Sequence, residues 1–405
     1  MDLIDMNEER RAKEIDAVSE GLSRAKSGKP YNSPLNLETV LKTDPFFGRQ
    51  IRRNEFTGES EWGGAALTDE GATFIRLAIG RTYGFTPTIG GVMEMVRYVA
   101  EGQPYHPVRD WLGALRWDGI ERLDTMLEAY AGADSTPLNR ELGRRFMISA
   151  VARVFQPGCK VDTILILAGP QGAGKSTFFR TLAGAPWFSD TPIDLRSKDA
   201  YLALRGVWLY EMAELASMRP REAETVKAFL SAQIDRFRKP YGHAMTTHQR
   251  QCVFVGTTNE HGFLKDPTGA RRFWPVLSSG RMEVLALQRD REQLWAEAAA
   301  AYRNRERWWL ELNSDQDLRE VHRDFEAEDP WTEPVRKWAE GWHGDITTEA
   351  VLSLGLDIEA GRQTRTHEIR VGGVLARLGY QRRRIQRDRV RRYVYIRDQA
   401  DGGEP

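Results

Sequence analysis

Apolar residues recur at helical spacing through the first third of the chain. Between Leu35 and Gln156 they return every three or four positions, which is typical of amphipathic helices. The segments that show this spacing are Leu67–Arg81, Val92–Glu101, Val108–Leu115, Arg122–Ala131 and Leu138–Val154. Before them, residues 1–34 combine a charged helical stretch with a linker that contains glycine, proline and serine. The pattern therefore predicts a charged tail over residues 1–34 and a helical N-terminal domain over residues 35–156.

The pattern changes after Gln156. Three short, mostly apolar runs follow, Thr163–Ala168, Val207–Tyr210 and Cys252–Thr257, and helical segments separate them. Short apolar runs are typical of parallel strands that are buried on both faces. Strands that alternate with helices predict an α/β fold. We expect an α/β core with a parallel sheet over residues 157–305, closed by a helix at Met282–Arg305.

The last quarter of the chain has a third pattern. Thr347–Leu354 and Thr366–Leu378 have helical spacing, whereas Arg384–Arg397 alternates as a strand does. Helices followed by a β-ribbon predict a small winged-helix-like domain, which we place at residues 306–405.

Composition narrows the class of protein. The 405 residues carry no formal net charge, and 41% are hydrophobic and 29% charged, so any attraction to nucleic acid must come from a local patch. Two cysteines and seven scattered histidines offer neither a disulfide framework nor zinc-ligand spacing. The longest strongly apolar run, Ile164–Ala168, is too short to cross a bilayer. Because Met1–Asp16 carries charges of both signs, it does not resemble a signal peptide, and we expect a cytoplasmic protein without a membrane partner.

One motif carries specific chemistry. Residues Gly169–Ser176 read GPQGAGKS and match the pattern GxxxxGK[ST] between a predicted strand and a predicted helix. Glycines let the backbone N–H groups surround a phosphate, Lys175 supplies charge to the β- and γ-phosphates, and Ser176 can ligate Mg²⁺. The sequence thus predicts ATP and Mg²⁺ as ligands. The residues expected to bind the nucleotide are Gly169, Pro170, Gln171, Gly172, Ala173, Gly174, Lys175, Ser176 and Thr177.

Two carboxylates follow the second predicted strand. Glu211 and Glu214 come at its carboxyl end, the edge of an open α/β sheet where ligands bind. We assign Glu211 to the metal and Glu214 to the attacking water, although the sequence leaves open which acid has which role. The alternative is that both are surface acids favoured by a helix N-terminus.

Polar residues also follow the third predicted strand. Asn259 ends that strand and can orient water against a γ-phosphate, while Arg271 and Arg272 come shortly afterwards. A guanidinium stabilises the charge on a transferring phosphoryl group, and one placed here could reach the nucleotide of a neighbouring subunit. The alternative is a structural pair that bridges acids such as Asp266.

Two basic segments are candidate DNA surfaces. Residues Arg236–Arg250 interleave basic and aromatic side chains, which suits contact with a sugar–phosphate backbone and stacked bases. The stretch Gly361–Asp398 holds twelve arginines, no lysine and three acids. An exposed basic turn and a set of subunit contacts are the respective alternatives. The residues expected to bind DNA are Arg238, Lys239, His243, His248, Arg383, Arg384 and Arg387.

Together these motifs resemble a known family. The segments HPVRDWLGALRWDGIERL, GCKVDTILILAGPQGAGKST, SKDAYLALRGVWLYEMAEL, FRKPYG, CVFVGTTN and DPTGARRFW resemble the virulence-associated protein E family of phages and mobile elements. That family is similar to superfamily 3 helicases, a hexameric branch of the AAA+ ATPases. The resemblance extends from about Leu35 to Val276 and is weaker beyond.

The resemblance implies roles for single residues. Residues Gly169–Ser176 would be the Walker A motif, Glu211 and Glu214 the Walker B acids, and Asn259 sensor 1. Arg271 or Arg272 would be the arginine finger, and Lys239 to His248 the DNA-contacting hairpin. The acids are spaced E-x-x-E, whereas many AAA+ proteins have adjacent acids.

Three functions compete on this evidence. The first is a ring-forming, ATP-driven motor, a replicative helicase of a phage or mobile element that acts on single-stranded or forked DNA, with other replication proteins as candidate partners. The second is a nucleotide-gated DNA-binding assembly that loads or blocks a replication factor without unwinding. The third, a small-molecule kinase, is disfavoured by the asparagine-tipped third strand and the later arginine pair.

Overall fold

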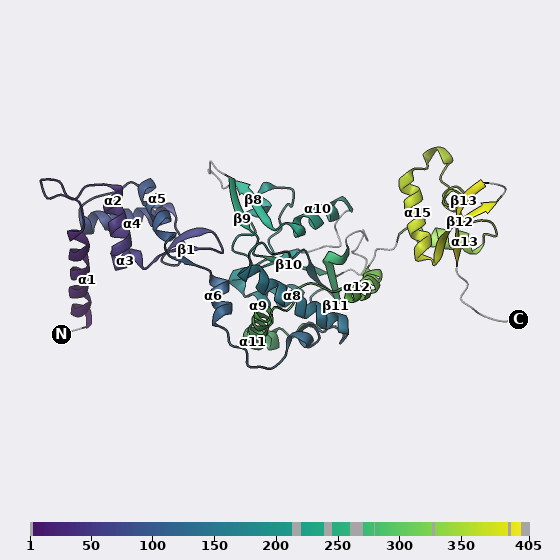
Figure 1. The fold of residues 1–405 in the computed structure, drawn as a ribbon, viewed down its shortest axis with the longest axis horizontal. Helices are drawn as coiled ribbons and strands as arrows, with labels where there is room; N and C mark the ends of the chain where they lie inside the picture. The colour runs from purple at the N-terminus through teal and green to yellow at the C-terminus, as the bar shows by residue number, and fades with distance from the viewer. Residues whose placement is uncertain are drawn as a thin grey trace. The chain divides into compact units, whose positions relative to one another are not determined.

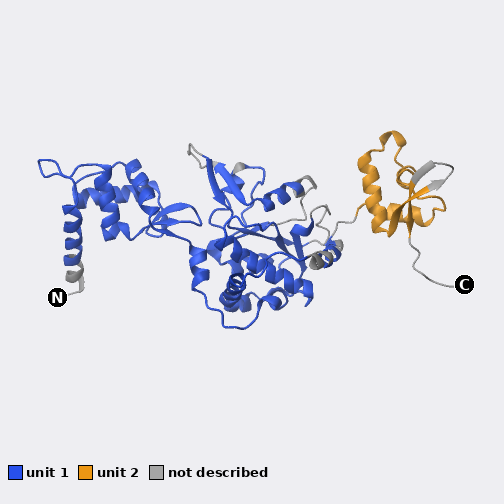
Figure 2. Ribbon diagram, viewed as in Figure 1, with its two compact units in different colours: residues 1–325 blue, residues 326–405 orange. Residues whose placement is uncertain are grey.

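The computed structural model describes residues 3–212, 220–238, 245–259, 270–278, 280–325, 329–387 and 390–397. It divides into two compact units, residues 1–325 and residues 326–405 (Figure 2). Among the described residues of the first unit, one hydrophobic core forms near the N-terminus, and one lies on each face of a central sheet.

The N-terminal core is mostly helical, as the sequence predicts. It is built from α1 (Leu3–Glu20), α2 (Pro34–Thr43), α3 (Pro45–Gly48), α4 (Asp69–Tyr83) and α5 (Ile89–Ala100). Thr68 and Thr88 start α4 and α5 by accepting hydrogen bonds from backbone N–H groups of the first turn. Val40, Ile75 and Val96 are fully buried between these helices.

A small sheet that the sequence analysis does not predict accompanies these helices. Its strand order is β3-β2-β1-β4. The strands are β1 (Ile51–Asn54), β2 (Glu59–Trp62), β3 (Ala65–Ala66) and β4 (Pro104–Tyr105). Strands of two to four residues are too short to display an alternating pattern, and their buried positions include the polar residues Asn54 and Glu61, whose side chains bond each other at 2.8 Å.

The central sheet of the described residues has five strands in the order β11-β5-β10-β7-β6, and neighbouring strands pair in parallel. The strands are β5 (Ile164–Ala168), β6 (Phe188–Ser189), β7 (Leu209–Met212), β10 (Val253–Thr258) and β11 (Phe273–Leu277). This confirms the predicted mixed α/β fold with a parallel sheet. The three predicted strands are present, displaced by one or two residues.

Alternate residues of the sheet face two helical layers. Leu165 and Leu167 of β5 belong to the same core as α8 (Pro137–Phe155), α9 (Lys175–Ala183) and α11 (Val284–Arg303). Ile164 and Ile166 point to the other side, toward α10 (Pro220–Ser231). Figure 1 shows α8, α9 and α11 on one side of β10, with α10 and the hairpin of β8 (Ile234–Arg238) and β9 (Met245–Gln249) on the other.

Several helices pack with the sheet although the sequence analysis places them in flanking domains. The helices α6 (Pro107–Ala114), α7 (Met126–Ala131) and α8 contribute Leu112, Leu127 and Phe146 to the core of the sheet. The helix α12 (Leu312–Phe325) does the same through Leu318. Tertiary packing therefore extends the sheet-containing part of the chain in both directions beyond residues 157–305.

The described residues of the second unit include three helical segments, a short 3₁₀ turn at Ala360–Arg362 and a hairpin. The segments are α13 (Thr332–Glu340), α14 (Thr348–Ala350) with the π-helical turn Val351–Gly355, and α15 (Arg365–Arg377). The hairpin joins β12 (Tyr380–Arg387) to β13 (Val390–Arg397) in antiparallel register. The core of this unit includes Val335, Leu352 and Val371. The backbone N–H of Tyr395 donates to Ile346 O at 2.8 Å, which joins β13 to the segment before α14.

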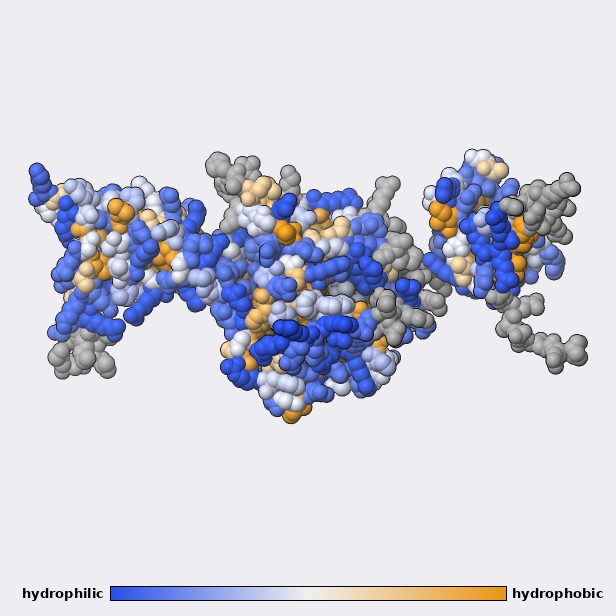
Figure 3. All heavy atoms as spheres, in the orientation of Figure 1, coloured by the Kyte–Doolittle hydropathy of each residue, from blue (hydrophilic) through white to orange (hydrophobic). Residues whose placement is uncertain are grey.

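The surface is largely polar. Hydrophilic residues cover most of the face drawn in Figure 3, with apolar residues in scattered groups, as expected of a chain in which 29% of residues are charged. Among the helices of the described residues, none combines the length and the apolar character that a bilayer crossing requires.

Candidate functional site

The glycine-rich loop lies between β5 and α9, at the carboxyl edge of the central sheet. Gly172 and Gly174 have φ angles of 80° and 94°, which side chains with a Cβ rarely adopt. At Gly169 the constraint is space, because a Cβ would lie 2.6 Å from the carbonyl oxygen of Ser278. The three glycines of the motif are thus explained by local backbone geometry.

The loop is open to solvent on its outer side. Gln171, Gly172 and Thr177 are exposed, and α9 begins at Lys175, so the first N–H groups of this nine-residue helix face the loop. Helix N-termini carry partial positive charge and attract anions. An anion can therefore approach the loop from solvent without displacing a side chain.

Lys175 lies under the loop and is only 7% exposed. Its Nζ donates hydrogen bonds of 2.8 Å to Gly169 O, to Pro170 O and to Asn259 Oδ1. Burial lowers the pKa of Lys175, and the nearby Glu211 carboxylate opposes that shift. The ammonium therefore joins the loop directly to the residue that follows β10.

Glu211 on β7 forms the second half of the site. Its Oε1 accepts hydrogen bonds from Ser176 Oγ at 2.7 Å and from Thr257 Oγ1 at 2.6 Å. The residue is 2% exposed, and its Oε2 has no hydrogen-bond partner among the described residues. A buried, unpartnered carboxylate oxygen costs about 1–3 kcal/mol, and such an oxygen is a ligand that hard cations prefer.

Thr257 is a site residue that the sequence analysis misses. The apolar pattern predicts Thr257 only as the last residue of a strand. In the structure, its hydroxyl donates a hydrogen bond to the carboxylate of Glu211. The available signal was a polar side chain two positions before Asn259 in an otherwise apolar run.

Strand order explains why these residues meet. The strand β10 lies between β5 and β7, with Thr258 opposite Ala168 and Val255 opposite Glu211. The carboxyl ends of the three parallel strands therefore share one edge, where open α/β sheets bind ligands. The other predicted acid, Glu214, lies outside the described residues.

The two arginines lie at the opposite edge of the sheet. They belong to the turn Ala270–Arg272, directly before β11, whose first residue Phe273 pairs with Ile164 at the start of β5. The five residues of β5 span about 16 Å, so neither arginine reaches the loop of its own chain.

The two arginines differ in their surroundings. Arg272 donates from Nε to Ser231 Oγ at 3.1 Å and lies 3.7 Å from Asp162 Oδ2. Arg271 is exposed and forms no ion pair within the described part of the chain. The predicted bridge to Asp266 concerns a residue outside the described ranges.

The predicted DNA hairpin is present as β8 and β9, which pair antiparallel from Ile234–Gln249 to Arg238–Met245. Its faces differ: Arg236 and Thr247 are exposed, whereas Asp235 and Phe237 are buried. Lys239 and His243 lie outside the described residues, and Arg238 ends β8.

His248, which the sequence analysis assigns to DNA binding, lies on the other face of the hairpin from Arg236. His248 pairs with buried Asp235 on the inner face of the hairpin, so it does not share the exposed face of Arg236. Burial lowers the pKa of His248, and the nearby Arg205 lowers it further. The register therefore makes Arg236, rather than His248, the described residue best placed for a DNA phosphate.

The hairpin of the second unit also exposes basic residues. Arg382, Arg383 and Arg384 of β12 are exposed, and the guanidinium of Arg382 lies 3.9 Å from the centre of the Tyr393 ring. Arg387 ends β12 opposite Val390. A cation over an exposed aromatic ring is a combination that single-stranded nucleic acids bind.

The fold and this edge define a mixed α/β protein with a polar site on a parallel sheet. The model of the virulence-associated protein E-like domain matches residues 112–327, more than half of the chain. The chain therefore belongs to that family, as the resemblance in the sequence implies. The matched range begins in α6 and covers every strand of the central sheet.

A solved structure shows the same fold at low identity. The apo structure of the NrS-1 C-terminal region is 11% identical with a TM-score of 0.51, covering 90% of this chain and 98% of that one. Its A form is also 11% identical, with a TM-score of 0.49 and coverages of 90% and 99%. A comparison with curated proteins finds no match.

Proposed function

We propose that this chain is a Mg²⁺-dependent ATPase with an AAA+ P-loop core, and that it works as an oligomeric DNA-translocating motor, a replicative helicase of a phage or mobile element. The observation that carries the proposal is the contact of Ser176 with Glu211 beside the contact of Lys175 with Asn259. These four side chains come from three chain segments and meet at one open loop.

The loop suits a triphosphate. The backbone N–H groups of residues 172–175 and the start of α9 would bind phosphate oxygens. Lys175 now gives its three protons to the loop carbonyls and Asn259, so these hydrogen bonds would be exchanged for phosphate oxygens. When bound, Mg-ATP supplies a phosphoanhydride bond and a metal that neutralises phosphate charge.

The donor set beside the loop suits Mg²⁺. Ser176 Oγ and the unpartnered Glu211 Oε2 are the hard oxygen ligands that this ion prefers, and both are already held in place. Thr257 fixes the Glu211 carboxylate from the other side. Asn259 is placed to orient the attacking water, and Glu214 is the proposed acid that polarises it.

The arginines support assembly. Because Arg271 and Arg272 lie across the sheet from their own loop, a role in catalysis requires the loop of a second copy. We propose a ring, most simply a hexamer, in which each exposed Arg271 faces the nucleotide of its neighbour.

Two surfaces support DNA binding. Arg236 on the β8–β9 hairpin and the arginines of β12 are exposed cations that phosphates would attract. The hairpin leads through Arg250 into β10, which ends at Thr258 just before Asn259, so a single strand links the proposed DNA surface to the nucleotide site. The helices and ribbon of the second unit fit a winged-helix role.

The test compares Lys175→Ala with Lys29→Ala, which changes an exposed lysine of the N-terminal linker. Phosphate release should fall to background in the first variant and stay unchanged in the second. Wild-type protein should hydrolyse ATP faster with single-stranded DNA and separate a forked duplex. ATP-dependent DNA binding without stimulation or strand separation on forks of either polarity would replace the motor with a gated assembly. Unchanged hydrolysis in Lys175→Ala would contradict the ATPase itself.

A further inference from the structure

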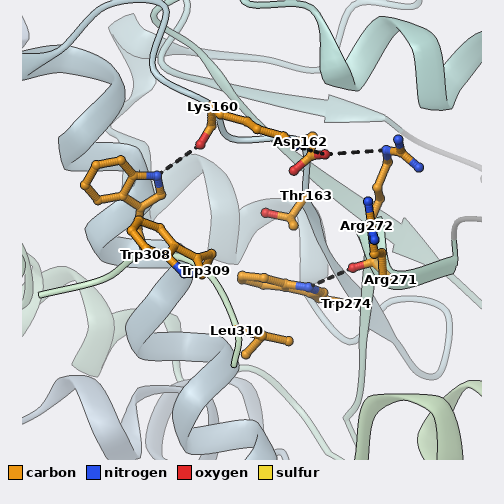
Figure 4. Close-up of a pocket in the computed structure, with 9 residues that line it drawn as sticks. All are labelled: Lys160, Asp162, Thr163, Arg271, Arg272, Trp274, Trp308, Trp309 and Leu310. Carbon is orange, nitrogen blue, oxygen red and sulfur yellow. Dashed lines mark hydrogen bonds and ion pairs between the residues drawn. The ribbon is translucent and has the colours of Figure 1, made fainter. Parts of the chain in front are cut away.

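A second cavity opens at the amino edge of the central sheet, away from the glycine-rich loop. It has a volume of about 430 Å³, within the size range of small-ligand sites. Figure 4 shows rings, cations and a carboxylate around the same space. The lining residues are Lys160, Asp162, Thr163, Arg271, Arg272, Trp274, Trp308, Trp309 and Leu310.

Indole rings form much of the wall, and their polar edges are already occupied. Trp274 Nε1 donates to Arg271 O at 3.2 Å, and Trp308 Nε1 donates to Lys160 O at 3.0 Å. Trp309 is 50% exposed and packs edge-on against Trp308, with ring centres 5.2 Å apart. The rings therefore offer apolar surface, and Trp309 offers the most accessible part of it.

A fixed strap presents Trp309. After α11 the chain turns at Arg305, which has a φ angle of 63°, and crosses to the cavity. Glu306 is held by two hydrogen bonds from Arg144, at 2.9 and 2.8 Å, and Arg307 O accepts from Arg145 Nη1 at 2.7 Å. These hydrogen bonds anchor the strap, residues 305–307, to α8, so the chain leading to Trp309 is held in place.

The rim carries excess positive charge. Lys160, Arg271 and Arg272 face a single carboxylate, Asp162. The ion pairs of Asp162 with Lys160 and Arg272 are long, at 3.8 and 3.7 Å, so they neutralise little of this charge. Arg271 has no ion pair with a described residue and is the cation most available to an anion.

From this geometry we infer that the cavity binds a nucleotide, with its base on the Trp309 indole and its phosphate on Arg271. Indoles bind flat rings and guanidinium groups bind phosphates, and a nucleotide is the ligand that carries both. An apolar peptide side chain would use the rings and leave the cations unused. The nucleotide can come from single-stranded DNA or from the glycine-rich loop of a neighbouring copy, and the second source rests on the proposed ATPase.

The experiment uses the full chain with Trp309→Ala, Trp309→Phe and Arg271→Gln. Two controls, Tyr31→Ala and Arg10→Gln, remove an aromatic ring and a charge of similar exposure in the N-terminal region. For the DNA source, fluorescein-labelled oligothymidylate is titrated into each variant in a Lys175→Ala background, so hydrolysis is irrelevant. For the neighbour source, the affinity of a non-hydrolysable ATP analogue is measured in assembled and in dissociated protein.

Either source gives a defined result. Trp309→Ala and Arg271→Gln should each weaken one ligand about tenfold, the effect expected of losing one base stack or one charged contact, while Trp309→Phe keeps most of the affinity. Weaker oligothymidylate binding identifies DNA as the source. Weaker analogue binding in the assembled protein alone identifies the neighbour. The inference is overturned if both affinities stay within twofold of the controls, or if only assembly is lost, since the cavity would then be a protein interface.

Discussion

The two edges of the central sheet use polar residues in opposite ways. At the carboxyl edge, Lys175, Ser176, Thr257 and Asn259 satisfy one another or Glu211 through hydrogen bonds of 2.6 to 2.8 Å. At the amino edge the contacts of Arg272 are longer, and Arg271 is exposed. The polar residues of the carboxyl edge are therefore bonded to one another within a single chain. The amino edge instead exposes the positive charge of Arg271.

This difference indicates what each edge needs. At the carboxyl edge the side chains are already gathered at one place: Lys175 would exchange its partners for phosphate oxygens, while Thr257 keeps the Glu211 carboxylate in position, which favours catalysis. Arg271, which is exposed and has no ion pair with a described residue, gains most from an anion brought by another molecule. The comparison therefore supports the proposed catalysis at the carboxyl edge and the proposed contact with a neighbour or DNA at the amino edge.

The largest effect should come from Glu211→Gln. The amide keeps the size of the side chain and removes the charge that would hold Mg²⁺, so ATP hydrolysis should fall at least 10³-fold. Phosphate release at saturating Mg-ATP measures this. The control Glu292→Gln changes an exposed acid of α11 and should leave the rate unchanged. A variant that keeps a tenth of the wild-type rate would remove Glu211 from the metal site.

Arg271→Ala should lower hydrolysis by about 10³-fold, at the lower end of what an arginine finger contributes. Because its loss lies at the opposite edge from Lys175, mixing Arg271→Ala with Lys175→Ala should restore part of the activity through composite sites. Mixing Lys175→Ala with Glu211→Gln should restore none, since both changes affect the same edge. If the ATPase activity does not recover in mixed assemblies that native mass measurements confirm, the two edges do not have the separate roles proposed for them.

Thr257→Val tests how much the prearranged carboxylate matters. A hydrogen bond to a charged group contributes about 1.5–3 kcal/mol, so kcat should fall about tenfold while the affinity for the nucleotide changes little. Ser231→Ala is the matched control, because it removes the hydroxyl that holds Arg272 at the other edge. Equal effects of the two changes on kcat would mean that the edges are equally prearranged.

The smallest effect concerns the β8–β9 hairpin, which precedes β10 at the amino edge. If Arg236 contacts one phosphate, Arg236→Ala should weaken single-stranded DNA binding a few-fold and reduce the salt slope by about 0.7. His248→Ala should leave the slope unchanged. Burial lowers the pKa of His248, so at any given pH its ring carries less positive charge than an exposed imidazole and should contribute little to the slope. DNA titrations at several salt concentrations measure the slopes of both variants. A shallower slope in His248→Ala would mean that His248 contacts DNA.

The local features of the site could be predicted from sequence. The glycine-rich loop is a short motif whose backbone conformation is set by its own glycines, and β5 and β10 are apolar runs of ordinary strand length. Their parallel pairing places Asn259 beside Lys175, which the order of the motifs anticipates. Motif and strand order thus suffice wherever neighbours in the sequence determine the geometry.

Other features depend on contacts between distant segments. The inward position of His248 follows from the hairpin register, because a shift of one residue would exchange the two faces. The cavity at the amino edge needs the strap after α11 to bring Trp309 beside Arg271. The strand β4 joins β1 by pairing across about fifty residues, between Asn54 and Tyr105, which no local pattern reveals.

The buried ion pair of Arg250 and Asp235 holds the base of the β8–β9 hairpin. Arg250 is 0% exposed, bonds Asp235 Oδ1 at 2.6 Å, and accepts a hydrogen bond from Gly158 N through its carbonyl oxygen. These contacts fix the base of the hairpin, so any tilt of the hairpin would turn about this pair. Its strands of five residues span about 16 Å, so a tilt of about 10° would displace the far end by about 3 Å. A sub-ångström shift of β10 would then displace the far end of the hairpin by a distance comparable to the spacing between stacked bases.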